Sequence, residues 1–380
     1  MGKVGLGIVF DLWLAEGLKK LGGVVVWMLL LSLSLAPHRA RATEWEVRGE
    51  VMSYATAVEG AGPVGVFRYL PTLKAEGSGV ADWQWDSEAT GFWYQAKDPS
   101  LGAEQKGEML RAWVRVYDPQ IEVRLGLQEL SFGPAVLLRS LQWFDTKDPL
   151  DPTGFTKGVK GALVRISTDS NAQYWVWGLV DNQDLSAQTR YVSDTQTPEY
   201  GGRAQFSKSL GEWAVTMHQR QVQLSAEQKT MESRVAFDTK LDLPYNGLWL
   251  EMVQINRQAE QAQQTITKEG RLTLGADYSL NLYDESAVVT VEKNWNHAAL
   301  AGGTLSQVED DSALLVSLPM GLLDVYSLSW FEEAHLGLST ASVDWQRTYD
   351  RYFWDLSLFQ VNQRGAAPLA GVGILFQYNH

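Results

Sequence analysis

The sequence predicts an all-β protein, a transmembrane antiparallel β-barrel of about 16 strands, within a range of roughly 14 to 18, with an inward-folded loop. Three observations lead to this fold class: an export signal, many segments in which apolar and polar residues alternate, and a final strand with aromatic residues on one face. After residue 43 no stretch approaches the roughly 20 apolar residues that a transmembrane helix needs. Only helices and closed barrels satisfy the backbone within hydrocarbon, so a barrel remains.

The first 42 residues have the order of a secretory signal peptide. Lys19 and Lys20 precede an apolar run over residues 23–36, and Ala40-Arg41-Ala42 supplies the small residues of a cleavage site. The alternative is an uncleaved membrane anchor, for which the run is short. We therefore predict a signal peptide at 1–42 that is removed and an outer-membrane β-barrel at 43–380.

The rest of the chain reads as strands with a period of two. In segment 271–280, Leu272, Leu274 and Tyr278 alternate with polar residues such as Arg271 and Asp277. Because loops and halves of one strand can pass the same criterion, and bacterial barrels have an even number of strands, the predicted number stays at about 16. Candidate strands begin near residues 44, 66, 80, 108, 119, 159, 172, 202, 211, 232, 245, 270, 284, 311, 322, 338, 350 and 370.

Alternation alone does not separate a membrane barrel from a soluble β-sandwich, whose apolar face points inward. The aromatic residues favour the barrel, because Trp and Tyr prefer the membrane–water boundary. Their alternative role is core packing in a soluble β protein. Helical periodicity is also nearly absent after residue 43. The residues that we expect, for the most part, in two boundary girdles are Trp45, Trp83, Trp85, Trp93, Tyr94, Tyr117, Trp249, Trp295, Trp330, Trp345, Tyr352 and Trp354.

The last strand resembles the C-terminal β-signal of outer-membrane barrels. In that signal a glycine is followed three and five residues later by apolar or aromatic residues, which here are Gly373, Phe376 and Tyr378. Asn379-His380 then follow the final aromatic residue, where many such proteins end. The resemblance implies that the barrel-assembly machinery binds the strand Gly371–Tyr378, and that outer-membrane lipid and lipopolysaccharide surround the barrel.

One connection differs from the short turns elsewhere. Residues 132–158 carry charges of both signs and two Asp-Pro steps, at 148–149 and 151–152, which enforce extended or turn geometry. The segment is also too apolar to be placed in bulk water, because it contains Leu137, Leu138, Leu141, Trp143 and Phe144. Long ordered loops are commonly functional.

The region from Arg111 to Pro152 resembles a porin-like outer-membrane β-barrel family that is largely uncharacterised and, more distantly, alginate-export-like porins. Elsewhere only the strand pattern agrees. The resemblance implies that residues 132–158 fold into the lumen and constrict the pore. The motifs that carry it are Arg111-Ala112-Trp113-Val114-Arg115, Gly126-Leu127-Gln128, Phe132-Gly133, Leu137-Leu138-Arg139, Trp143-Phe144-Asp145, Asp148-Pro149 and Asp151-Pro152.

Charged residues in and beside this segment allow two interpretations. Opposite charges across a narrow opening would set ion and solute preference. Alternatively, the same charges pair with Glu122, Glu129 and each other and anchor the loop. The predicted constriction and selectivity residues are Arg111, Arg115, Arg124, Arg139, Asp145, Lys147, Asp148, Asp151 and Lys157, with Arg165 on a neighbouring strand.

The composition and the motifs exclude several other functions. The chain has no cysteine, so it has neither a disulfide framework nor a thiolate nucleophile, and its formal charge of −13 disfavours nucleic acid. The histidines after residue 42 stand in no recognisable triad context, and no metal or nucleotide motif is present. The acidic runs at 284–285 and 309–311 are predicted to be solvated turns, with weak Ca²⁺ binding as the minor alternative. We expect no enzyme, cofactor or metal site.

The sequence therefore predicts a passive porin channel in the bacterial outer membrane for small polar or ionic solutes. The alternatives are a non-conducting structural or complex-forming barrel and, more weakly, a lipid-acting barrel enzyme. The basic residues near the predicted constriction favour anions, whereas the acidic chain as a whole opposes them, so the sign of selectivity stays open. A homo-oligomer is compatible with the sequence.

Overall fold

The computed structural model describes residues 41–79, 82–98, 102–145, 156–182, 189–225, 228–258, 266–282, 285–300 and 305–380. Residues 1–40 of the predicted signal peptide lie outside these ranges, so its removal stays a prediction. All regular elements in the described ranges are strands. No helix in these parts of the chain is long and apolar enough to cross a membrane.

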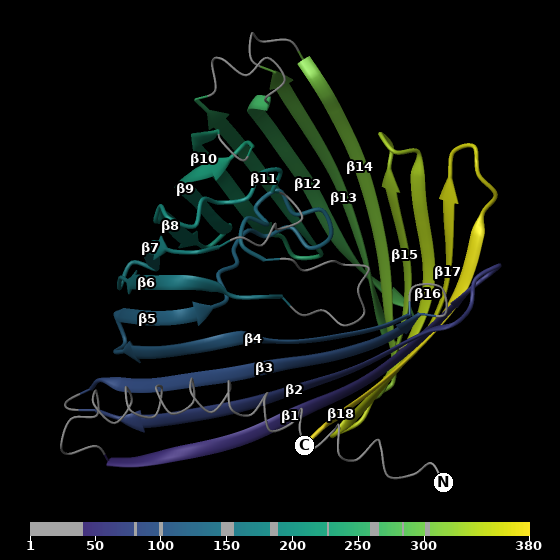
Figure 1. The fold of residues 1–380 in the computed structure, drawn as a ribbon, viewed down its shortest axis with the longest axis horizontal. Coiled ribbons are helices and arrows are strands. Elements are labelled where there is room, and N and C mark those ends of the chain that lie inside the picture. Colours follow the sequence, from purple (N-terminus) through teal and green to yellow (C-terminus); the bar gives the residue numbers. More distant parts are fainter. Residues whose placement is uncertain are drawn as a thin grey trace.

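Eighteen strands form one antiparallel sheet (Figure 1). They are β1 (Arg41–Val58), β2 (Val64–Ser78), β3 (Gln84–Asp98), β4 (Gly102–Tyr117), β5 (Ile121–Gln128), β6 (Val159–Ser167), β7 (Ala172–Leu179), β8 (Glu199–Lys208), β9 (Gly211–Gln223), β10 (Lys229–Asp242), β11 (Asn246–Arg257), β12 (Ile266–Leu282), β13 (Glu285–Leu300), β14 (Leu305–Met320), β15 (Asp324–Glu333), β16 (Leu338–Thr348), β17 (Tyr352–Gln363) and β18 (Leu369–Asn379).

Each strand pairs with its neighbours in sequence, and β1 pairs with β18, which closes the barrel. The closing register runs from Glu50 opposite Asn379 to Val58 opposite Gly371. The predicted fold class is therefore confirmed, but the sheet has eighteen strands instead of about 16. Every candidate segment corresponds to one strand, and none was a loop or half of a longer strand, so the number lies at the upper limit of the predicted range of 14 to 18.

The two ends of the barrel differ in the length of their connections. At the end that holds the first residues of β1 and the last of β18, every connection is short, such as 118–120, 209–210 and 349–351. The opposite end carries the long connections 129–158 and 180–198. We call these the short-turn end and the long-loop end. In outer-membrane barrels, short turns face the periplasm and longer loops the cell exterior.

Side chains alternate between the two faces of the wall, as the period-two pattern predicts. In β11, Trp249 and Glu251 are buried inside the barrel, whereas Leu248 and Met252 are exposed on the outside. In β12 the predicted split is confirmed, with Arg271 buried and Leu274 exposed. A closed barrel whose exposed outer face is apolar is built to sit in lipid.

One predicted turn is instead part of a strand. Residues 309–311 lie within β14, where Glu309 accepts a hydrogen bond from Asn296 Nδ2 at 2.6 Å and Asp310 pairs with Lys293. Polar partners on β13 stabilise these acidic residues in the sheet, so a loop is not needed. Of the other predicted acidic turn, Glu285 begins β13 and Asp284 lies outside the described residues.

Candidate functional site: the barrel lumen

The connection between β5 and β6 enters the barrel and packs on the inner face of its wall. Its first described stretch, residues 129–145, is called the inner loop below. Phe132 stacks on Trp177 of β7 with ring centroids 5.8 Å apart, and Phe144 meets His218 of β9 edge-on at 4.9 Å. With Trp143 these residues form an apolar cluster that extends to β11. The apolar side chains that are unsuited to bulk water are thus buried against the wall.

His218 has a structural role in this cluster. It is buried, accepts a hydrogen bond at Nδ1 from Trp177 Nε1 (3.2 Å), and lies 3.1 Å from Glu199 through Nε2. Because Nδ1 accepts, Nε2 is the nitrogen left to donate to the carboxylate. The imidazole is therefore fixed between an indole and a carboxylate.

The inner loop is also held through its main chain by the opposite wall. Glu251 of β11 and Glu292 of β13 accept hydrogen bonds from backbone N–H groups of residues 135–141. Thr273 of β12 donates to the carbonyl of Leu138 at 2.7 Å. The described loop thus spans the inside of the barrel from its root at β5 to β11–β13.

Beneath the long-loop end lies a buried network of alternating charges that we call the arginine–glutamate network. It is centred on Glu232 of β10, which contacts Arg220 (2.7 Å), Arg234 (2.8 Å) and Arg257 (2.6 Å). Arg257 also reaches Glu269 of β12 at 2.6 Å. The further members are Arg271 on Glu269, and Arg190 between Glu269 and Glu309.

This network was not among the features predicted from the sequence. Glu232 and Arg234 stand two residues apart, as do Glu269 and Arg271, which places each pair on one face of its strand. Opposite charges at this spacing in β10 and β12, the two strands that flank β11, were the available signal. The register between the strands, which decides that these pairs meet, could not be read from the sequence.

The predicted basic residues point into the lumen, but each described one has an acidic partner. Glu122 of β5 is shared by Arg115, Arg124 and Arg165, which brings β4, β5 and β6 together. Lys147, Asp148 and Asp151 lie outside the described residues. The other pairs are Arg111 with Glu129, Arg115 with Asp86, Arg139 with Asp145, and Lys157 with Glu108.

The inner face of β15–β17 is different, because it carries small polar side chains and unpaired acids. Ser329 and Ser342 are linked at 2.7 Å, and Ser342 donates to Asp344 at 2.6 Å. Asp355 accepts from Gln346 at 2.9 Å. Among the described residues, no Lys, Arg or His forms an ion pair with Asp344 or Asp355. We call this face the acidic wall.

The outer surface supports the girdle prediction for most of its residues. Near the short-turn end Trp354 and Tyr352 lie beside Phe376, with Trp354 at 4.6 Å between centroids. Trp249 is an exception: it is buried in the lumen, where its Nε1 donates to Glu292 at 2.9 Å. Its position in β11 has inward parity, and a buried acceptor is available there. Tyr94 and Tyr117 are also on inward positions.

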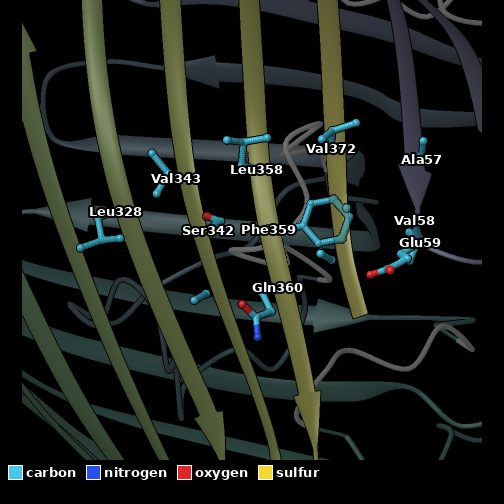
Figure 2. A pocket seen from close by; sticks show the side chains of 13 residues that line it. Ala57, Val58, Glu59, Leu328, Ser342, Val343, Leu358, Phe359, Gln360 and Val372 are labelled. Atoms are coloured by element: carbon cyan, nitrogen blue, oxygen red, sulfur yellow. The ribbon is translucent and has the colours of Figure 1, made fainter. Parts of the chain in front are cut away.

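A groove of about 650 Å³ lies across β15–β18 and the end of β1 (Figure 2). Leu328, Val343, Leu358 and Val372, one from each of four neighbouring strands, line it and are exposed on the lipid-facing side. The groove therefore belongs to the apolar outer band, not to the lumen. Within the described ranges no three His, Asp or Glu side chains are grouped to hold a metal ion.

No protein-family model and no curated protein matches the chain. Solved structures do match it. A BenF-like porin from Pseudomonas fluorescens Pf-5 is 10% identical with a TM-score of 0.61, covering 89% of this chain and 98% of its own. Pseudomonas aeruginosa OpdK with vanillate (9% identity, TM-score 0.60) covers 89% and 98%, and a double variant of OccD1, also called OprD (8%, 0.59), covers 90% and 97%.

The fold is that of an outer-membrane porin. Its exposed outer face is apolar, as in barrels that are surrounded by lipid. The likeness extends over nearly the full length of these porins, whereas the narrower resemblance to alginate-export-like porins finds no support in it.

Proposed function

We propose that this protein is a passive channel for small polar or ionic solutes, narrowed by the connection 132–158. The observation that carries the proposal is the uneven filling of the lumen. The inner loop lies against β7–β13, whereas the acidic wall of β15–β17 carries small hydroxyl groups, the partly exposed Asp344 and the buried Asp355. Such a wall suits hydrated solutes, and a barrel of this size encloses a water-filled lumen unless it is plugged.

Within this proposal the channel prefers cations. The described basic residues near the loop are compensated by carboxylates, so their fields largely cancel at a distance. Asp344 and Asp355 lack such compensation, and uncompensated acidic side chains in a pore favour cations. The proposed cation preference, on which the sequence left both signs open, is supported by the pairing of the charges and not by their number.

Single-channel recording of the refolded protein in a planar bilayer tests the proposal. We expect stable conductance steps and, in a KCl gradient, a reversal potential of the sign that K⁺ permeation produces. A folded barrel that never conducts would favour the alternative of a structural or complex-forming barrel. The absence of enzymatic activity, the assembly role of Gly371–Tyr378 and a homo-oligomer stay as predictions.

A further inference from the structure

We infer that Glu251 and Glu292 are positioning residues of the pore: two wall carboxylates that hold the inner loop in one place through its backbone. The inference rests on the proposed channel for its functional meaning. The holding itself can be tested without any conduction measurement, so the two can fail separately.

Glu292 collects N–H groups from three successive loop residues. Val136 N donates to Oε1 at 2.7 Å, Leu137 N donates to Oε2 at 2.9 Å, and Leu138 N also donates to Oε2. Successive N–H groups that converge on one point form an anion-binding concavity. Here the bound anion is a side chain of the barrel itself, and Trp249 Nε1 holds it from the wall side.

Glu251 holds the two sides of the same stretch. Its Oε1 accepts from Ala135 N at 3.0 Å and its Oε2 from Leu141 N at 2.8 Å. Gly133 has a φ of 96° and lies against this carboxylate, so that a Cβ there would collide with Oε1. A side chain at position 133 would therefore both strain the backbone and displace Glu251.

These contacts need a carboxylate and not merely a polar side chain. An ionised Glu only accepts, and both of its oxygens are used by N–H donors, whereas a Gln would turn an NH₂ group toward one set of donors. The buried N–H groups would then be unsatisfied, which is costly. The isosteric change Glu→Gln is thus expected to release the loop without altering its packing volume.

The remaining polar groups of the stretch are also satisfied by the wall. Ser140 is fully buried and hydrogen-bonds to Thr273 at 2.8 Å and to Asn294 at 2.9 Å. Val136 is the contrast, since the residue is 55% exposed although its N–H is bound. The loop is therefore a fixed part of the pore wall and not a mobile gate.

Cysteine reactivity tests this arrangement, because the chain has no cysteine of its own. Ser140→Cys places a thiol at the buried position and Val136→Cys places one at the exposed position. In the refolded barrel we expect a water-soluble methanethiosulfonate reagent to label Val136→Cys quickly and Ser140→Cys slowly. Adding E251Q and E292Q should raise the rate at Ser140→Cys at least about tenfold and leave Val136→Cys nearly unchanged.

Glu212→Gln is the matched control. Glu212 is a lumen-facing carboxylate near the short-turn end that accepts from Gln205 and Ser207 and has no contact with the inner loop. It should leave the labelling of Ser140→Cys unchanged. An unchanged rate in a folded E251Q/E292Q barrel would overturn the inference.

A change made on the loop covers the case in which the wall variant does not fold. Val136→Pro removes one N–H donor to Glu292, affects an exposed side chain and leaves the barrel wall intact. It should also speed the labelling of Ser140→Cys, and an unchanged rate would count against the inference. The wild-type barrel could fail to conduct while the Glu→Gln variants still speed the labelling of Ser140→Cys. That result would support the loop anchors and contradict the proposed channel.

Discussion

Two regions of the lumen wall differ in how their charged side chains are paired. Below, β9–β12 are called the matched half and β15–β17 the open half. Across β9–β12 the inward charges are numerous, buried and matched, with Glu232 surrounded by three arginines. Across β15–β17 they are few and unmatched, as Asp344 and Asp355 have only polar uncharged partners. The number of charges in a lumen therefore says little about its selectivity, because charges that are compensated by a partner contribute little to the potential that a solute experiences.

The matched half also has a cost that the open half avoids. Desolvation of buried ions offsets most of their mutual attraction, so the arginine–glutamate network contributes little net stability, while the loss of one partner is expensive. Its geometry instead ties four neighbouring strands and residue 190 to one arrangement. The matched half is specified structure, and the open half is left for solutes.

The largest effect is expected when the matched half loses its centre. Glu232→Ala leaves Arg220, Arg234 and Arg257 without their shared carboxylate, which should lower the free energy of unfolding by about 3–5 kcal/mol. Urea unfolding of the barrel in lipid vesicles measures it. Glu46→Ala, which breaks an exposed pair with Arg48, should cost about 0–1 kcal/mol. Equal unfolding midpoints for the two variants would remove the distinction.

The second-largest effect is expected from a charge introduced on the lipid-facing side of the open half. Leu358 is 61% exposed and lies in the outer apolar band, so Leu358→Arg should cost about 2–4 kcal/mol if it lies near the bilayer midplane. The adjacent Ser357 has the opposite parity, and Ser357→Arg should be tolerated in the wet lumen. The same unfolding assay compares them. A larger loss from Ser357→Arg would reverse the assignment of faces.

Selectivity should respond to the unmatched acids. Removing both charges with Asp344→Asn and Asp355→Asn should move the reversal potential in a KCl gradient most of the way toward zero and change stability little, because no ion pair is broken. Asp350→Asn serves as the control, because Asp350 lies in an exposed turn at the short-turn end. It should shift the reversal potential only slightly. An unchanged reversal potential in the double variant would place the selective charge elsewhere.

The smallest effect is expected from a matched cation. Arg124→Gln leaves Glu122 with Arg115 and Arg165, so the potential in the lumen changes little. The reversal potential should shift slightly in the direction of greater cation preference. A shift larger than that of the Asp344/Asp355 double variant would mean that pairing does not cancel the electrostatic effect of the basic residues.

Much of the barrel could be predicted from the sequence, because alternate residues of a strand face opposite sides of the wall and the alternation of apolar and polar residues shows this parity. Leu274 and Arg271 are correctly assigned to opposite faces by alternation alone. Parity does not say which strands are neighbours in register, so the contact of Arg257 with both Glu232 and Glu269 was beyond reach. Trp249 was misplaced for a different reason: its position in β11 has inward parity, but its residue type favours the membrane boundary and it was assigned there.

The inner loop was recognised by its composition but its attachment was not. Its aromatic residues indicated burial, and Phe132, Trp143 and Phe144 are indeed packed against the wall. The attachment to Glu251 and Glu292 uses backbone N–H groups, which nearly every residue type provides, so no sequence pattern in the loop reports it. The signal lies only in two glutamates on inward positions of β11 and β13.

The pairing of β1 with β18 constrains the order in which the barrel can fold. Met52 pairs with Gln377, so this edge stays open until the last strand has arrived. Contacts so distant along the chain make folding slow, and an unpaired edge is prone to associate with other chains. The loop anchors share this dependence, since Val136 binds Glu292 across 156 residues. The interior therefore takes its final shape late, once β13 stands beside the strands already in place.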